Sequence, residues 1–224
     1  PDTAWDCHGV YTGSTVVEDD RLAVIYTGNV KVDGQHDFIH TGREANVIRI
    51  DRYPDGTWSP TRLLLSCQDY PSFCTRHVRD PKVWRQGHEW FMVTGARRQD
   101  DQGMVLLWRS DDGEQWHFKS VITSEKAFGY MWECPDLFRL DGHWFLSFSP
   151  QGVTREQDRR QNIYLSGYIP MKGGEDPCTA ELDGDFVDWD YGFDFYAPQT
   201  FETRDGRRIL FGWAGMADAD AEYT

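Results

Sequence analysis

Residues 80–95 read DPKVWRQGHEWFMVTG, and the pattern of this stretch returns along the chain. The copies at 134–148 (CPDLFRLDGHWFLSF) and 197–212 (APQTFETRDGRRILFG) repeat its order of proline, apolar pair, glycine turn and apolar strand. A fourth copy at 12–28 (TGSTVVEDDRLAVIYTG) keeps the shape, with an acidic turn in place of the glycine turn. Each copy is typical of a β-hairpin. Such internal repetition indicates a repeat architecture.

The spacing of the repeats predicts what they build. From Gly13 to Pro81, Pro135 and Pro198 the steps are 68, 54 and 63 residues, each enough for four short strands and their turns. Further hairpins lie between the copies, as at 105–118, where Asp-Asp-Gly supplies the turn. We therefore expect an all-β fold, a five-bladed β-propeller whose first blade and end of the last blade are missing. An all-β sandwich with similar hairpins is the alternative.

The expected domain is a single partial propeller over residues 1–224. Its blades are predicted near residues 9–60, 75–122, 130–190 and 194–224.

Composition narrows the classes of partner. The chain has 224 residues, 39% hydrophobic and 15% aromatic, and a formal net charge of −14. This charge argues against nucleic acid and anionic membrane as partners, since both require clustered basic residues. The five cysteines are odd in number and show no zinc-type spacing, which predicts a reducing, cytoplasmic location and no metal. No apolar run reaches the length of a membrane span.

The residues just before the prolines are the candidates for chemistry. In a propeller the innermost strands begin near the axis, so Arg79, Asp80 and Glu133 are expected to line a central funnel together with Tyr196. Carboxylates beside aromatic rings suit glycoside hydrolysis, in which one acid protonates the leaving oxygen. Taken alone, Asp80 and Glu133 could equally be turn-capping or ion-paired residues.

Two motifs carry a resemblance to a known family. HVRDPKVW at 77–84 and MWECPD at 131–136 resemble two signature motifs of glycoside hydrolase family 32, the invertases, sucrose-6-phosphate hydrolases and fructanases. GVYTGS at 9–14, DFYAPQ at 194–199 and ILFGW at 209–213 are also similar to stretches of that family. The resemblance covers nearly the whole chain.

The resemblance implies roles for individual residues. Glu133 would be the general acid/base, and Asp80 would stabilise the transition state by holding hydroxyls of the fructosyl ring. Arg79 would be a fixed hydrogen-bond donor beside them. Four more positions match substrate contacts of the family, with core packing as the alternative for each: Tyr11, Thr12, Tyr196 and Trp213.

One departure from the family concerns the nucleophile. The family uses an Asp in a Trp-Met-Asn-Asp-Pro-Asn-Gly-like motif on the first blade, and no stretch here resembles it. The nucleophile is therefore expected to be absent from this chain, which by itself should be inactive. Both ends are expected to be truncated, so we expect self-association or a longer parent polypeptide.

The function implied by the resemblance is that of a β-fructofuranosidase. It would release fructose from sucrose, sucrose 6-phosphate or a short fructan by a retaining mechanism, without metal or organic cofactor. One rival is another propeller glycosidase, such as an arabinan-degrading enzyme. The other rival is a non-catalytic sugar-binding propeller, because a fold alone does not establish activity.

Overall fold

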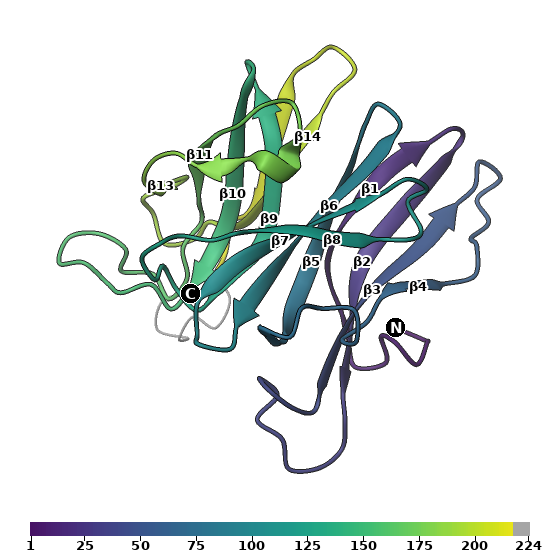
Figure 1. Ribbon diagram of the computed structural model, residues 1–224, viewed down its shortest axis with the longest axis horizontal. Coiled ribbons are helices and arrows are strands. Elements are labelled where there is room, and N and C mark those ends of the chain that lie inside the picture. Colours follow the sequence, from purple (N-terminus) through teal and green to yellow (C-terminus); the bar gives the residue numbers. More distant parts are fainter. Residues whose placement is uncertain (217–224) are drawn as a thin grey trace.

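The computed structural model describes residues 1–216 and consists of antiparallel sheets (Figure 1). The first sheet has the strand order β1-β2-β3-β4. Its strands are β1 (Val10–Glu18), β2 (Arg21–Lys31), β3 (Arg43–Arg52) and β4 (Arg62–Leu65). The second sheet repeats this order with β5 (Cys74–Gln86), β6 (Glu89–Arg98), β7 (Gly103–Ser110) and β8 (His117–Ile122).

The third sheet is more irregular, and the fourth is a single hairpin. In the third sheet β10 lies between β9 and β11, and both β12 and β13 pair with β11. The strands are β9 (Met131–Leu140), β10 (His143–Gln151), β11 (Gly167–Lys172), β12 (Glu181–Leu182) and β13 (Val187–Asp188), with the 3-10 helix η1 (Pro177–Thr179) before β12. The hairpin consists of β14 (Tyr196–Glu202) and β15 (Arg208–Trp213).

The four sequence repeats are the hairpins β1-β2, β5-β6, β9-β10 and β14-β15. Their turns explain why the strands reverse where they do. Between β9 and β10, Asp141 and Gly142 have φ values of 49° and 83°, and two successive residues with positive φ match the right-handed twist of the strands. In the acidic turn of the first hairpin, Asp19 has a φ of 53°.

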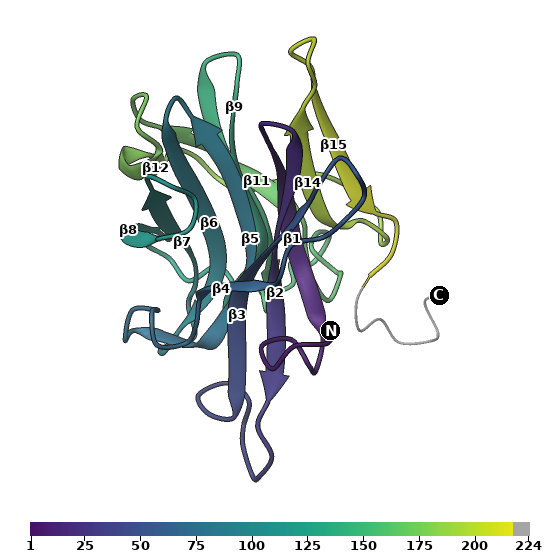
Figure 2. The same ribbon diagram turned by 90° about the vertical axis from the view of Figure 1, so that its right-hand side faces the viewer.

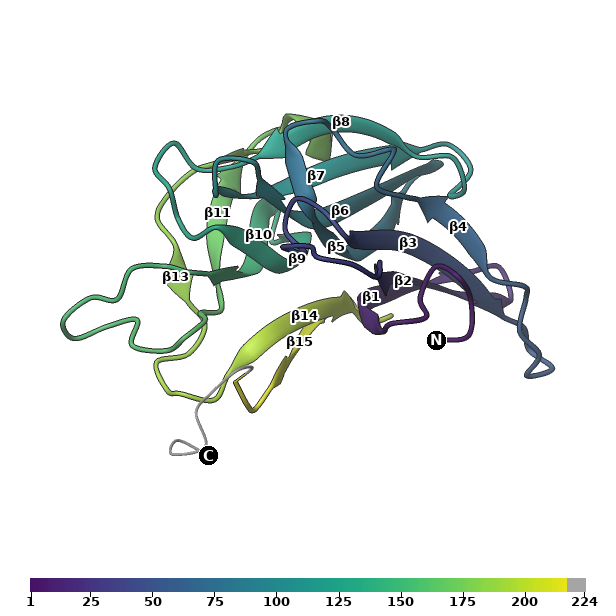
Figure 3. The same cartoon turned by 90° about the horizontal axis from the view of Figure 1, so that it is seen from below.

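The sheets are arranged around a common centre (Figure 3). The inner strand β5 contacts β1 on one side and β9 on the other, and β9 also contacts β14. Strands β4 and β8 lie at the outer edges. Separate radial sheets rather than two facing sheets exclude the sandwich alternative. The prediction of an all-β propeller is therefore confirmed, while five as the number of blades stays a prediction.

The core lies between neighbouring blades. In β6, Trp90 and Met92 pack against the first sheet, whereas Phe91 and Val93 point the other way toward the third sheet. This alternation follows from the two-residue period of a strand, and it explains why a continuous run of seven residues in β6 is buried. A blade with a neighbour on each side must be apolar on both faces.

Polar contacts also tie the inner strands together. The Ser14 hydroxyl donates to the Pro81 carbonyl at 2.9 Å and accepts from the Val83 amide at 2.9 Å, joining β1 to β5. The Lys82 ammonium lies 3.3 Å from a carboxylate oxygen of Asp136, joining β5 to β9. These contacts fix the starts of the inner strands relative to one another.

The hairpin β14-β15 stands at one side of the array (Figure 2) and leaves apolar side chains exposed. Phe201 and Phe211 stack at 5.8 Å between ring centroids, yet 48% and 65% of their surfaces are exposed. The blade predicted near 194–224 extends past this hairpin to residues 217–224, which lie outside the described part of the chain. Within the described part, no helix is long and apolar enough to cross a membrane.

Candidate active site

A β-bulge recurs in every inner strand, next to a residue that lines the axial cavity. The ladder of β1 with β2 shifts after Tyr11, that of β5 with β6 after Arg79, and that of β14 with β15 after Tyr196. The ladder of β9 with β10 shifts after Glu133. A bulge inserts an extra residue, bends the strand and re-aims its side chains, and such bulges are common beside active sites.

Three of the bulges have the same unusual backbone. Asp80, Cys134 and Ala197 have φ values of 63°, 48° and 51°, and each directly precedes a proline. The left-handed region costs a residue with a Cβ atom roughly 1 kcal/mol, so the surrounding strands must hold these residues there. The repeated proline in the sequence marks this strained position on these three inner strands.

The bulges aim their side chains into one cavity of about 550 Å³. Each of the four inner strands contributes two or three residues to its wall, and Trp213 lies at the end of β15. All seven site residues predicted from the sequence line this cavity: Tyr11, Thr12, Arg79, Asp80, Glu133, Tyr196 and Trp213.

Glu133 is held on both carboxylate oxygens. Arg79 donates to Oε1 from Nε at 3.1 Å and from Nη2 at 2.5 Å. Gln151 donates its amide to Oε2 at 2.8 Å, and the Tyr196 hydroxyl donates to the same oxygen. The side chain of Glu133 retains 16% exposure, so the carboxylate is fixed yet open to the cavity.

Asp80 is the more buried carboxylate, with 4% of its surface exposed. Its Oδ2 accepts a hydrogen bond from the Cys134 amide at 3.0 Å, and its own amide donates to the Thr27 hydroxyl at 2.8 Å. Burial raises the pKa of Asp80 to about 6, with the Arg79 guanidinium opposing the rise and the charge of Glu133 adding to it. Paired carboxylates with a perturbed pKa are typical of functional sites.

Arg79 links the two carboxylates to His77. Burial alone would lower the pKa of Arg79, but the charges of Glu133 and Asp80 outweigh it and raise that pKa. Its Nη1 donates to Nδ1 of His77 at 2.7 Å. Burial, together with the positive charge of Arg79, lowers the pKa of His77 to about 3. His77 is therefore a neutral acceptor that holds the guanidinium.

Tyr196 is a permanent hydrogen-bond donor to Glu133. Burial and the neighbouring charge of Glu133 raise the pKa of its hydroxyl far above the ordinary value. The hydroxyl therefore keeps its proton at neutral pH and donates it in the hydrogen bond to Oε2 of Glu133.

Reasoning from the sequence missed three polar residues of the cavity wall: Arg43, His77 and Gln151. His77 lies two residues before Arg79, and this spacing places both side chains on one face of a strand. The sequence alone could therefore have predicted His77 as a neighbour of Arg79 in the cavity. Gln151 pairs with Met131 across the β9-β10 hairpin. Knowledge of this strand register would have placed Gln151 close to Glu133. No local sequence pattern predicts that Arg43 lines the cavity, because only the pairing of β2 with β3 brings it there.

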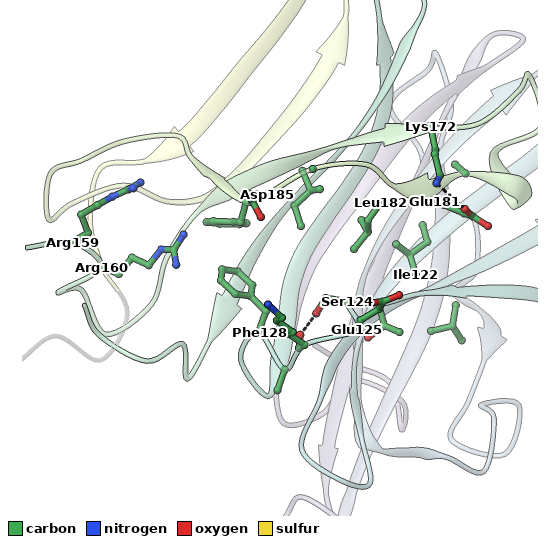
Figure 4. A pocket seen from close by; sticks show the side chains of 18 residues that line it. Ile122, Ser124, Glu125, Phe128, Arg159, Arg160, Lys172, Glu181, Leu182 and Asp185 are labelled. Atoms are coloured by element: carbon green, nitrogen blue, oxygen red, sulfur yellow. Dashed lines mark hydrogen bonds and ion pairs between the residues drawn. The ribbon is translucent and has the colours of Figure 1, made fainter. Parts of the chain in front are cut away.

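A second, larger hollow of about 1030 Å³ lies between the second and third sheets (Figure 4). Its acidic residues lie apart in that view. Glu181 forms an ion pair with Lys172 at 3.6 Å, and Asp185 lies apart from both in Figure 4. Across residues 1–216, no group of three or more His, Cys, Asp or Glu side chains could hold a metal ion.

Antiparallel sheets packed around an axis, with two carboxylates lining the axial cavity, define a β-propeller with a site of the kind that glycosidases use. The chain matches the family model described as "Glycosyl hydrolases family 32 N-terminal domain" over residues 1–224. It therefore belongs to glycoside hydrolase family 32, as the sequence motifs predicted.

Individual relatives agree with this assignment. The chain is 41% identical to the sucrose-6-phosphate hydrolase of Bacillus subtilis (strain 168), over 98% of this chain and 45% of that protein. Its structure is similar to that of a mutant of the Bombyx mori GH32 beta-fructofuranosidase BmSUC1 in complex with sucrose (TM-score 0.80, 37% identity, 94% of this chain and 44% of that chain).

A third relative is the sucrose-6-phosphate hydrolase from Lactobacillus gasseri (TM-score 0.85, 26% identity, 97% of this chain and 44% of that chain). The chain thus spans less than half the length of the relatives it matches.

Proposed function

We propose that this chain carries the acid/base side of the active site of a β-fructofuranosidase, which releases fructose from sucrose or a close derivative. The observation that carries the proposal is the convergence of Glu133 and Asp80, from two different blades, on one cavity with Arg79 between them. Names of relatives support the substrate class, since they include sucrose-6-phosphate hydrolases and a beta-fructofuranosidase in complex with sucrose.

Glu133 is the proposed general acid/base. Its carboxyl group would give a proton to the glycosidic oxygen, so that the glucosyl part leaves as a neutral alcohol, and would then take a proton from the attacking water. Arg79, Gln151 and Tyr196 keep both carboxylate oxygens in place for these two transfers. Such fixation limits the motion that would misalign the proton with the leaving oxygen.

Asp80 is the proposed stabiliser of the transition state. The fructosyl ring acquires positive charge as the glycosidic bond breaks, and a buried carboxylate attracts this charge strongly because little water screens it. The same carboxylate can accept hydrogen bonds from ring hydroxyls. The Cys134 amide leaves its Oδ1 available for this purpose.

The retaining mechanism also requires a nucleophile on the opposite face of the sugar. Among the described residues that line the cavity, Asp80 and Glu133 are the two carboxylates, and the proposal gives both of them other roles. Because no stretch of residues 1–224 resembles the nucleophile motif of the family, we propose that the nucleophile belongs to polypeptide outside these residues. The greater length of the relatives is consistent with this.

Product analysis tests the proposed function against its rivals. The complete native polypeptide would be incubated with sucrose and with an arabinan oligosaccharide, and products would be separated by chromatography. We expect fructose and glucose from sucrose. Arabinose as the sole product would support the propeller glycosidase rival, and sucrose binding without any product would support the sugar-binding rival. Either result would contradict the proposal.

A cytoplasmic location is also proposed. All five cysteines are free, and Cys74 and Cys134 are buried as thiols. Burial raises the pKa of Cys74 to about 12, so this thiol is unreactive. Such cysteine usage is typical of a reducing compartment. Recovery of the native protein in the soluble cell fraction would support this location, and recovery outside the cells would contradict it.

A further inference from the structure

A short turn in the connection from β2 to β3 is built around one exposed carboxylate. Oδ1 of Asp37 accepts the backbone amides of Ile39, His40 and Thr41 at 3.0, 2.9 and 3.0 Å. These bonds, that of His40 first, lower the pKa of Asp37 to about 2, so the carboxylate is charged and keeps its donors. The connection lies at the lower end of the first sheet in Figure 1. The described wall of the axial cavity does not include Asp37.

The turn holds Phe38 in a conformation that is unusual for a bulky residue. Its φ is 56°, and the bonds that Asp37 accepts close the turn around it. Nε of Arg43 donates to the Phe38 carbonyl at 3.1 Å. The His77 ring also bonds to the Phe38 backbone, and this bond opposes the lowering of its pKa by burial and by Arg79. A bond that favours the protonated ring is one in which the ring donates, so the Phe38 carbonyl is its acceptor.

The same turn is bound to β5 immediately before His77. The Arg76 amide donates to the Ile39 carbonyl at 2.8 Å, and Nε of Arg76 donates to the His40 carbonyl at 3.3 Å. The successive carbonyls of residues 38–40 therefore bond to two successive residues of β5. A movement of the turn must be passed on to this part of β5.

His77 connects the turn to the proposed acid/base. Its Nδ1 lies 2.7 Å from Nη1 of Arg79. A guanidinium has no acceptor, so Nδ1 accepts this bond and the proton of the neutral ring lies on Nε2. The Phe38 carbonyl favours the same tautomer, because it requires a donor from the ring. Arg79 in turn donates to Oε1 of Glu133 from Nε and Nη2.

We propose that Asp37 positions the acid/base from outside the cavity. Its turn fixes the Nε2–H tautomer of His77, and His77 fixes the guanidinium that holds Glu133. This rests on the proposed function of the axial cavity. Proton transfer requires the carboxyl group to be aligned with the leaving oxygen, whereas binding of the sugar depends less on this alignment. Loss of the turn should therefore lower kcat more than it changes KM.

Kinetics of the complete native polypeptide with sucrose test the proposal. Asp37→Ala removes the acceptor of three amides, whereas Asp37→Asn keeps an oxygen that can accept them. We expect kcat to fall about 10-fold in Asp37→Ala, with KM changed less than about 3-fold, and to fall less than about 3-fold in Asp37→Asn. The matched control is Asp112→Ala in the turn between β7 and β8, where Oδ1 accepts the amides of Glu114 and Gln115 at 2.8 Å each. It loses the same kind of contact and should keep kcat within about 2-fold.

A double variant tests whether the effect passes through His77. His77→Leu removes the acceptor for Arg79, so kcat should fall at least as far as in Asp37→Ala. Adding Asp37→Ala to His77→Leu should then lower kcat by less than about 2-fold more, because both changes release the same guanidinium.

Four kinetic results would overturn the proposal. They are an unchanged kcat in Asp37→Ala, a rise in KM alone in that variant, an equal loss of kcat in Asp112→Ala, and losses that multiply in the double variant. If Asp37→Ala does not fold, as judged by its thermal melt, Asp37→Ser replaces it. A serine hydroxyl is a shorter acceptor, so a smaller loss of kcat with the same KM is expected.

A spectroscopic measurement separates this proposal from the proposed function. The nitrogen NMR shifts of an imidazole ring distinguish its two neutral tautomers without substrate, and the His77 signals are identified by their absence in His77→Leu. We expect the Nε2–H tautomer in the wild type and in Asp37→Asn, and a population of the other tautomer in Asp37→Ala. If the polypeptide does not cleave sucrose, the proposed function fails, yet this change would still support the link from Asp37 to His77. An unchanged Nε2–H tautomer in Asp37→Ala would overturn the link, whatever the activity.

Discussion

Glu133 receives hydrogen bonds from three side chains, and this arrangement makes its substitution informative. In Glu133→Gln the side chain keeps its size but has no proton to transfer. We expect turnover of sucrose by the complete polypeptide to fall by roughly 10² to 10⁴-fold, while substrate binding persists. Steady-state kinetics and calorimetry measure the two effects separately.

The control for this variant is Glu181→Gln, which removes an exposed carboxylate between the second and third sheets. It should leave turnover unchanged. Near-normal turnover in Glu133→Gln would remove Glu133 from the chemistry, even if the cavity binds sucrose.

The raised pKa of Asp80 predicts a dependence of stability on pH. The pKa rises from 3.8 to about 6 on folding, so between these values the folded state binds more protons than the unfolded state. The contribution of Asp80 to the free energy of unfolding is therefore present below about pH 4 and is lost as the pH rises through about 6.

The comparison with Asp80→Asn isolates this contribution, because asparagine does not titrate. The free energy of unfolding of the wild type relative to Asp80→Asn should fall by roughly 2 to 3 kcal/mol between about pH 4 and pH 7. Denaturant unfolding of both proteins at several pH values measures the difference. A difference that is flat with pH, or that rises, would show that burial does not raise the pKa of Asp80.

The sequence predicted Glu133 and Asp80 because each lies in a contiguous motif beside a proline. It did not predict the contacts of these residues. Gln151 reaches Glu133 from the end of β10, and Arg43 reaches the cavity through the register of β2 with β3. Such neighbours depend on strand pairing, and a one-residue slip would turn their side chains to the opposite face.

The hairpins themselves could be predicted well from turn residues and apolar alternation, but the bulges could not. A residue before proline is ordinarily extended, and nothing in Tyr196-Ala197-Pro198 shows that Ala197 adopts a φ of 51°. The neighbouring strands impose this conformation. The prolines therefore marked the part of three inner strands that lies at the cavity, while the backbone geometry that aims the side chains came from tertiary packing.

Gly95 on β6 provides a test of how closely the blades must approach. It pairs with Arg79, and a Cβ atom added to it would lie 2.0 Å from the Trp132 carbonyl oxygen, directly before Glu133. Gly95→Ala must therefore displace the backbone of β9. We expect a loss of roughly 1 to 3 kcal/mol in the free energy of unfolding, together with reduced turnover, because Glu133 moves with β9.

Gly174→Ala is the matched control, since a Cβ atom there meets nothing within 4 Å. Thermal melts and kinetics of both variants check the prediction. Unchanged stability and turnover in Gly95→Ala would mean that the contact between the second and third blades is not needed to position the acid.

The molecule as a whole leaves apolar surface at the hairpin β14-β15. Phe211 and Trp213 are 65% and 54% exposed, whereas inner blades such as β5-β8 are covered on both faces. Residues 1–224 expressed alone should therefore self-associate, because a soluble monomer rarely exposes such a patch. Sedimentation of that fragment measures the effect. A stable monomer at micromolar concentration would contradict the prediction.

Transfer of the fructosyl group to methanol tests whether this cavity holds that group during a retaining reaction. The complete polypeptide would be incubated with sucrose in dilute methanol, and the glycoside formed would be identified by NMR. A fructosyl-enzyme attacked by methanol gives methyl β-fructofuranoside, which does not mutarotate, so the account predicts this product and predicts its loss in Glu133→Gln. Formation of a methyl glucoside or of the α-fructofuranoside would contradict the account.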